Sequence, residues 1–198
     1  YLPGTAEKGP QWLEGMKMGG DFRLRYEGIN QNEATRDRNR FRYRLRWKIE
    51  KQLTENLDLG FRLVNGTTTD PTSTNQTMTG DFSYKSFLLD QAYVKYRPTF
   101  LTDRISSLEK AEFGGGKFEN PFQKNSSGMV WDSDVMPEGF YESFQLSLQD
   151  GKLKPFATLG QYLLQENTSA PDAEMYGFQT GVRWTPPGAA KDSGAEVT

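Results

Sequence analysis

The fold is decided by the stretch Arg40-Phe41-Arg42-Tyr43-Arg44-Leu45-Arg46-Trp47-Lys48-Ile49. Cations and large apolar residues alternate here over ten positions without a break. Successive side chains of a β-strand point to opposite faces, so the cations share one face and the apolar groups the other. The stretch therefore predicts a strand that lies between an apolar environment and water.

A transmembrane β-barrel offers both environments to a single strand. Such a strand needs about 9 to 11 residues and alternates lipid-facing with lumen-facing side chains. Two other interpretations of this one stretch stay open. One is a soluble amphipathic strand, and the other is a basic strand that contacts nucleic acid through Arg and aromatic residues.

The composition excludes several classes of protein. The 198 residues carry 24 basic and 26 acidic side chains, a net charge of −2, whereas a nucleic-acid-binding domain is distinctly basic. Cysteine and histidine are absent, which removes disulfides, thiolate metal sites and the commonest general base and zinc ligand. We therefore expect no nucleic-acid partner, no enzyme activity, no catalytic residues and no cofactor.

Hydropathy excludes a membrane-spanning helix as the source of the apolar character. The mean hydropathy is −0.76, and no apolar run reaches the roughly 18 residues that such a helix needs. Barrel strands remain compatible with this value, because alternation of polar and apolar residues averages the hydropathy away.

Alternation of the same kind recurs along the chain and predicts eight strands. Their expected bounds are residues 21–27, 40–49, 57–63, 87–97, 108–118, 140–148, 153–164 and 176–184. We expect residues 1–19 to form a leader that could include a short helix, residues 20–185 to form the barrel strands, and residues 186–198 to be a turn or linker at a truncated end. The pattern assigns no faces to the strand at 153–164.

The connections and the aromatic residues favour the barrel over the other two interpretations. The connections after the first, third and fifth strands are long, those after the second and sixth are short, and those after the fourth and seventh are intermediate. Outer-membrane barrels show a similar asymmetry. Aromatic residues then fall into two groups, one at each end of the strands. The short-connection end has Phe22, Trp47, Tyr96 and Trp184, and the opposite end has Tyr26, Phe41, Phe87, Phe118, Phe140, Tyr162 and Tyr176.

The cationic faces of the first three strands indicate a wide barrel. We expect them to line the pore with Arg23, Arg25, Arg40, Arg42, Arg44, Arg46, Lys48 and Arg62. Like charges that face each other across strands are destabilising, and a water-filled lumen relieves them better than the packed interior of an eight-stranded barrel. We therefore expect an all-β, antiparallel up-and-down transmembrane β-barrel of about 16 strands, of which this chain supplies about eight.

The chain resembles the putative porin family of Gram-negative bacteria, on four motifs. They are Gly20-Asp21-Phe22-Arg23-Leu24-Arg25-Tyr26-Glu27, the run Arg40 to Arg46, Gln91-Ala92-Tyr93-Val94, and Trp131-Asp132-Ser133-Asp134-Val135-Met136-Pro137-Glu138-Gly139. The resemblance spans most of residues 12 to 184, as the front half of a family member. It implies a channel in the bacterial outer membrane for small hydrophilic solutes or ions, in contact with lipid and lipopolysaccharide, and suggests a homotrimer.

The third long loop carries the candidate site. Its acids Asp132, Asp134 and Glu138 are expected to fold into the lumen opposite the arginines at 42, 44 and 46, as a constriction with a transverse electric field. The alternative is that this loop caps the barrel outside, with its acids in water or on a divalent cation. Three acids at this spacing are sparser than an EF-hand loop, so we expect no metal.

Two other classes of protein remain open from the sequence. One is a structural barrel that sheathes a partner protein, such as an electron-transfer conduit. The other is a soluble β-sandwich that acts as a binding module. Flux of solutes would separate the channel from the sheath, and solubility without detergent would identify the sandwich.

Overall fold

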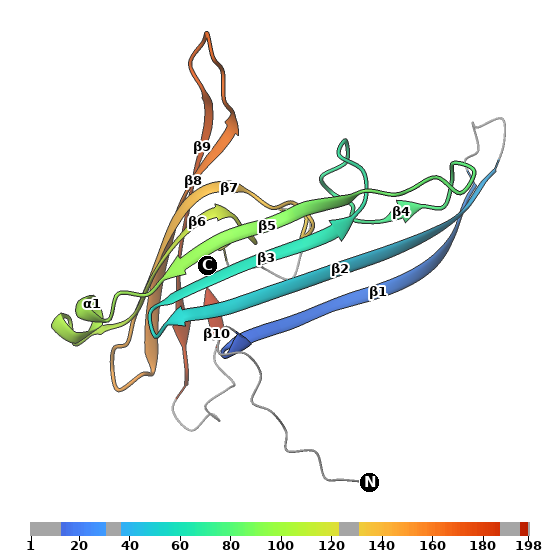
Figure 1. Cartoon of the computed structure of the whole chain (residues 1–198). Helices are drawn as coiled ribbons and strands as arrows, with labels where there is room; N and C mark the ends of the chain where they lie inside the picture. Colours follow the sequence, from blue (N-terminus) through green and yellow to red (C-terminus); the bar gives the residue numbers. More distant parts are fainter. Residues whose placement is uncertain (1–12, 31–36, 123–130, 187–194, 198) are drawn as a thin grey trace, which may run out of the picture.

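The protein folds into one antiparallel sheet. The computed structural model describes residues 13–30, 37–122, 131–186 and 195–197. Its strands are β1 (Met16–Ile29), β2 (Arg38–Thr54), β3 (Leu57–Asn65), β4 (Gln76–Thr77), β5 (Phe87–Tyr96), β6 (Leu108–Lys117), β7 (Glu138–Leu146), β8 (Leu153–Gln165), β9 (Ala173–Trp184) and β10 (Ala195–Val197). The sheet order is β1-β2-β3-β5-β6-β7-β8-β9-β10, and β4 pairs with β2 (Figure 1).

This topology confirms the prediction of an all-β, antiparallel, up-and-down architecture. All eight expected strands are present, each beside its neighbour in the chain. The described strands do not close into a ring, because the order starts at β1 and ends at β10. They also form one sheet, not the two packed sheets of a β-sandwich.

Some elements differ from the expected bounds. β1 begins at Met16, inside the expected leader, because the ladder with β2 continues past Gly19 and Gly20 to the pair Met16–Lys51. Gly19 and Gly20 are therefore part of β1, where they pair with Lys48 and Trp47. A Cβ at Gly20 would lie 2.1 Å from the Arg46 carbonyl oxygen, which explains why a glycine occupies this position of the strand. β10 lies in the segment expected to be a turn or linker.

A short helix occupies one of the predicted connections. α1 (Thr99–Arg104) follows Pro98, which stands at the helix N-cap, two residues after the end of β5. Within the described ranges, no helix has the length and apolar character needed to cross a membrane.

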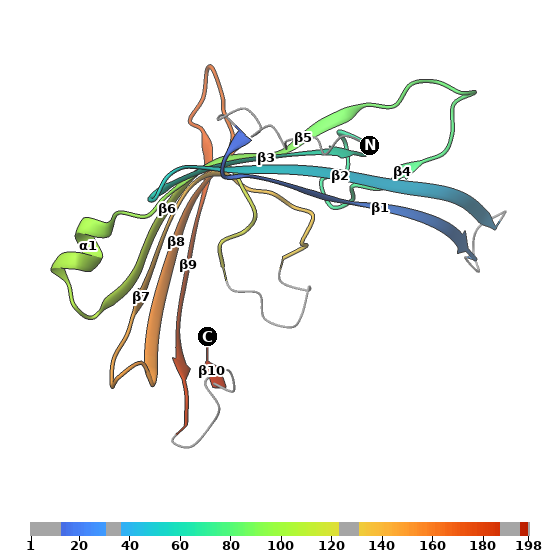
Figure 2. The same ribbon diagram turned by 60° about the horizontal axis from the view of Figure 1, so that its bottom comes forward.

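The sheet is bent, and one loop lies in the hollow of the bend. Figure 2 shows β1, β2, β3 and β5 on one side of the bend and β6 to β9 on the other. The segment 131–137, which leads into β7, lies between these two parts of the sheet. We call the hollow side the inner face and the opposite side the outer face.

The outer face is apolar and exposed. Phe22 and Leu24 of β1 are each 64 % exposed, and Phe178 of β9 is 71 % exposed. The other large apolar side chains of this face include Met18, Tyr26, Phe41, Trp47, Leu59, Phe61, Leu89, Val94, Tyr96, Phe140, Leu159, Leu163, Tyr176 and Trp184. A soluble protein buries such a face, so the outer face has the character of a surface that contacts lipid.

The inner face carries the buried residues, which also assigns the faces of β8. Phe156, Thr158 and Tyr162 of β8 are buried, whereas Leu159 and Leu163 are exposed on the outer face. The packed core is a cluster of four rings on the inner face, from Tyr93, Phe118, Tyr141 and Tyr162. It lies beneath the ends of the β6–β7 loop and is small for a sheet of this size.

Glycines on neighbouring strands make room for these rings. A Cβ at Gly114 would lie 1.9 Å from the Tyr141 ring, and a Cβ at Gly60 would lie 2.5 Å from the Tyr93 ring. Each tyrosine therefore lies across a glycine of the adjacent strand, an arrangement that covers the glycine backbone and fixes the ring. This packing explains Gly114 in β6. At Gly116 the backbone of β5 leaves no room for a side chain, because a Cβ there would lie 2.2 Å from the Ala92 carbonyl oxygen.

We expect Gly114→Ala to lower the free energy of unfolding by about 1–3 kcal/mol, because overpacking forces the Tyr141 ring out of place. Gly19→Ala is the matched control, since no atom lies within 4 Å of the added methyl group. Both values are measured by urea denaturation of the protein in detergent micelles. Equal effects of the two substitutions would contradict this account of the glycines.

Candidate functional site

The structure places the eight predicted cations on the inner face. We call them the arginine wall: Arg23, Arg25, Arg40, Arg42, Arg44, Arg46, Lys48 and Arg62. The register pairs Arg23 with Arg44 and Arg25 with Arg42 across β1 and β2. It also pairs Lys48 with Arg62 across β2 and β3. Directly opposed residues share a face, so the wall is one continuous surface over three strands.

Carboxylates on the same face relieve the repulsion between these cations. Glu27 lies 2.7 Å from Arg25 and also pairs with Arg40 and Arg42. Asp21 lies 2.6 Å from Arg44. The sequence pattern already put these two acids on the cationic side of β1, although the expected pore lining named only the cations.

Two further acids come from the neighbouring strands. Glu50 lies 2.8 Å from Lys48, and Asp90 pairs with Arg62. With Asp134 of the loop described below, five carboxylates contact seven of the eight cations, and the formal charges of the eight cations and five carboxylates sum to +3. The wall remains basic, but far less than its sequence indicates.

The β3–β5 connection covers part of the wall. Arg23 donates to the Asn75 side chain over 2.6 Å, and Arg42 donates to the Asn75 carbonyl over 2.9 Å. Arg46 donates to Thr74 Oγ1 over 2.8 Å. Thr74 and Asn75 are buried against the wall as a result. The sequence predicted only a polar loop here, because its Asn, Thr and Ser residues have no period that shows where the loop lies.

Asn65 joins this covering segment to β2. β4 extends the edge of β2 beyond the end of β3, through the pairs of Thr77 with Arg42 and of Gln76 with Tyr43. At the end of β3, the Asn65 side chain accepts from the Leu45 amide and donates to the Tyr43 carbonyl. One side chain thus replaces a missing step of the backbone ladder.

The β6–β7 loop reaches the wall through Asp134. Asp134 Oδ1 lies 2.5 Å from Arg46, and the two side chains are 15 and 16 % exposed. Asp132 contacts no wall residue; its Oδ1 accepts from the Asp134 amide at 2.8 Å and shapes the turn. Glu138 is the first residue of β7 and pairs with Lys117 at 2.7 Å. Of the three predicted acids, only Asp134 therefore contacts the wall, and it meets Arg46 and neither Arg42 nor Arg44.

Buried contacts hold the rest of this segment across the inner face. Met136 is buried and its sulfur accepts from Gln91 Nε2 at 3.2 Å. Trp131 Nε1 donates to the Val135 carbonyl at 3.0 Å. The segment 131–137 is thus anchored to β5 through Gln91 and to β2 through Arg46, positions that the sequence pattern did not indicate.

A second ion-pair cluster lies at the short-connection end. Arg97 bridges Asp58 at 2.6 Å and Glu112 at 2.8 Å, and Tyr141 donates to Glu112 at 2.8 Å. Burial alone would lower the pKa of Arg97, but its hydrogen bonds to the two carboxylates raise that pKa above its ordinary value. Among the described residues, no group of three or more His, Cys, Asp or Glu is arranged to hold a metal ion.

Removal of one partner from a buried ion pair should show how far the wall depends on its acids. We expect Arg62→Met to lower the free energy of unfolding by about 3 kcal/mol, because Asp90 would keep a buried charge without its cation. The double variant Arg62→Met with Asp90→Asn should recover at least half of that loss, as measured by urea denaturation in detergent. If the double variant is as unstable as the single one, the pair does not act as described.

Comparison with known proteins identifies the family. A family model described as putative porin matches residues 29–191, the bulk of the chain. No curated protein matches the sequence. The matched residues include β2 with most of the arginine wall, all the strands from β3 to β9, and the loop that carries Asp134. On this match, the chain belongs to the putative porin family.

Proposed function

We propose that this chain forms part of an outer-membrane porin, a water-filled channel through which small hydrophilic solutes or ions diffuse passively. The observation that carries the proposal is the reversed distribution of side chains. Large apolar groups on the outer face are exposed, whereas seven of the eight cations of the arginine wall, on the inner face, are paired with carboxylates. Lipid on one side and water on the other would stabilise this arrangement.

The open edges of the sheet support a larger barrel. Among the described strands, β1 pairs only with β2, so its other edge has no described partner. At the opposite end of the sheet, β10 pairs with β9 over only three residues. Within a bilayer the unpaired backbone groups of such edges would be costly, so further strands would have to complete the ring. We propose a barrel of about 16 strands, the size at which a lumen holds an aqueous channel.

The arginine wall and the β6–β7 loop would determine selectivity. In this proposal the wall lines the lumen, and the segment 131–137 narrows it beside Arg46. A channel of this kind selects by its width and by fixed charges rather than by chemistry on the solute. The formal charge of +3 would favour anions within a Debye length of about 8 to 10 Å. The family and this mechanism agree with a protein that is not an enzyme.

Solute flux into liposomes tests the proposal against a barrel that only sheathes a partner protein. We expect liposomes that contain the full-length, folded protein to swell in arabinose at rates well above those of empty liposomes. A larger sugar such as stachyose is the control for pore width and should enter more slowly. Folded, inserted protein without flux of either sugar would favour the sheathing function.

We also propose that the porin is a homotrimer, with a polar pair of the outer face near the contact between copies. Glu142 lies at the middle of β7, opposite Phe113 and Leu159, and accepts from Gln161 Nε2 at 2.8 Å. A carboxylate at mid-strand is costly against lipid, so contact with another protein surface explains it better. Gln161→Cys should cross-link copies through a bismaleimide, whereas Leu24→Cys on β1 should not; equal cross-linking would contradict this contact.

A further inference from the structure

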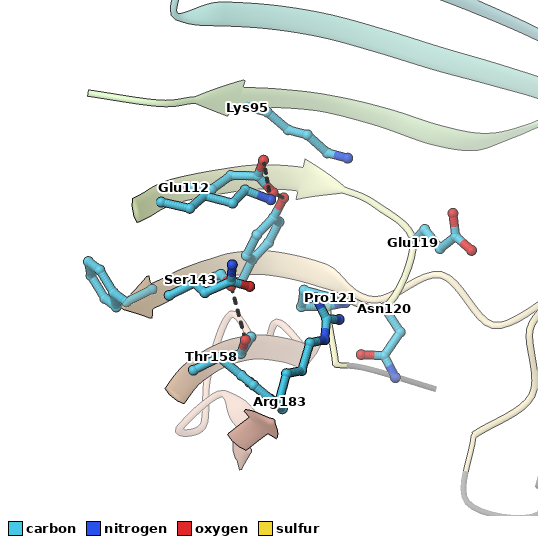
Figure 3. Close-up of a pocket in the computed structure, with 13 residues that line it drawn as sticks. Lys95, Glu112, Glu119, Asn120, Pro121, Ser143, Thr158 and Arg183 are labelled. Carbon is cyan, nitrogen blue, oxygen red and sulfur yellow. Dashed lines mark hydrogen bonds and ion pairs between the residues drawn. The ribbon is translucent and has the colours of Figure 1, made fainter. Parts of the chain in front are cut away.

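A pocket of about 300 Å³ lies on the inner face, apart from the arginine wall. Its walls come from β5 to β9 and from the first residues of the β6–β7 loop. Figure 3 shows Lys95 entering from β5 on one side and Arg183 from β9 on the other, with Glu119 and Asn120 along the loop. The volume is at the lower end of the range for ligand sites, which is about 300–1,000 Å³.

Lys95 brings a positive charge that none of the described acids neutralises by direct contact. Its ammonium lies 4.9 Å from the centroid of the Tyr93 ring. Among the described residues, no carboxylate lies within ion-pair distance of it. The nearby acid Glu112 already contacts Arg97, Lys110 and Tyr141, so its charge is shared among three other donors.

Two more groups present donors to the pocket. Ser143 Oγ and Thr158 Oγ1 lie 3.1 Å apart and share one hydrogen bond, which uses one of their two hydroxyl hydrogens and leaves the other. The side-chain oxygen of Asn120, Oδ1, accepts from the Phe122 amide at 3.1 Å. That bond fixes the orientation of the Asn120 side chain and leaves its NH₂ group as a donor.

An acceptor lies beside these donors. Gln145 lines the pocket and donates through Nε2 to Glu109 at 2.9 Å, so its amide oxygen remains as an acceptor. The groups still available are thus an ammonium, a hydroxyl and an amide NH₂, together with one carbonyl oxygen. This set suits a ligand that has an anionic group rich in acceptors and also a hydroxyl group to donate.

We propose that this pocket is a subsite for small hydroxylated carboxylates, the chemical class of the sugar acids. The carboxylate would lie between Lys95, Asn120 and the Ser143–Thr158 pair, and a ligand hydroxyl would donate to Gln145. The inference rests on the proposed function in one respect, since the inner face must be open to solutes for the subsite to serve transport. Occupancy of the pocket itself can be measured without transport.

Binding is measured with the full-length protein in detergent micelles, by saturation-transfer difference NMR with gluconate as the probe. Glucose supplies the hydroxyl groups without the charge, and acetate supplies the charge without the hydroxyl groups. We expect gluconate to bind at least about tenfold more tightly than either, because it alone uses both the charged and the neutral contacts.

The variants separate the subsite from general charge effects. Lys95→Gln should weaken gluconate binding about tenfold or more, and Lys95→Arg should retain most of it. The double variant Ser143→Ala with Thr158→Val should weaken it about fivefold. Lys152→Gln is the matched control, because it removes the same charge from the exposed turn between β7 and β8 and should change nothing.

Each outcome bears on the proposal. Preferred binding of gluconate that is lost in Lys95→Gln, with the fold intact by circular dichroism, supports the subsite. Equal binding of the three probes, or equal effects of Lys95→Gln and Lys152→Gln, overturns it. Failure of the channel would show separately, as absence of flux in liposomes, and would leave the NMR result on the pocket valid.

Discussion

Phe178→Arg should cost about 2–4 kcal/mol of stability in a bilayer, and it should sharply reduce the amount of folded protein that inserts. Phe178 lies at the middle of β9 on the outer face and is 71 % exposed. In a soluble protein, a surface substitution of this kind changes the free energy of unfolding by less than about 0.5 kcal/mol. The size of the effect therefore reports whether water or an apolar environment, either lipid or a neighbouring copy, covers this face.

Phe82→Arg is the matched control for this prediction. Phe82 is at least as exposed, but it lies in the β3–β5 connection, where its backbone φ is +64°. The same change of residue should be neutral there, because loops of a barrel extend into water. Both variants are refolded into lipid vesicles, and their stability is measured by urea titration. Equal and small effects at the two sites would contradict the assignment of the outer face to lipid.

Asp134→Asn should raise the permeability of anions relative to cations about tenfold, provided that the inner face lines a pore. A unit charge about 6 Å from an ion in water acts with about 0.7 kcal/mol. Its loss favours an anion and disfavours a cation by about threefold each, so their ratio changes about tenfold. Loss of this carboxylate also leaves Arg46 with the more distant Asp21, at 4.0 Å, as its remaining acid. The wall would thus become more positive at the point where the loop approaches it.

Asp132→Asn provides the comparison for the loop. Asp132 contacts the Asp134 amide and no residue of the arginine wall, and an asparagine at this position can accept the same hydrogen bond. We therefore expect little change in ion selectivity from this variant. The reversal potential in a salt gradient measures both variants. Unchanged selectivity in Asp134→Asn would show that the loop does not form a charged constriction.

The strands and their faces could be predicted from the sequence wherever alternation is strong. The stretch from Arg40 to Ile49 assigned its own faces, because no other regular structure puts every cation on one side. The pattern failed in β8, where Pro155, Thr158 and Gly160 break the contrast between the faces. There the buried side is set by packing of Phe156 and Tyr162 on neighbouring strands, which is a tertiary contact.

The candidate site could be predicted only in part, for a related reason. Alternation placed the cations of the wall on one face, and the density of acids drew attention to the loop with Asp134. Which acid contacts which cation depends on the register of the strands and on the path of the loop. No short stretch of sequence indicates either of them. The buried positions of Thr74 and Asn75 and the anchoring of Met136 on Gln91 belong to the same class of contact.

The most direct test of a porin is single-channel recording of the full-length protein in a planar lipid bilayer under a potassium chloride gradient. We expect open conductance steps with a reversal potential that favours chloride, because the inner face is basic. The absence of steps from protein that is folded and inserted would contradict the channel. Cation-selective steps would retain the channel but contradict the role of the arginine wall.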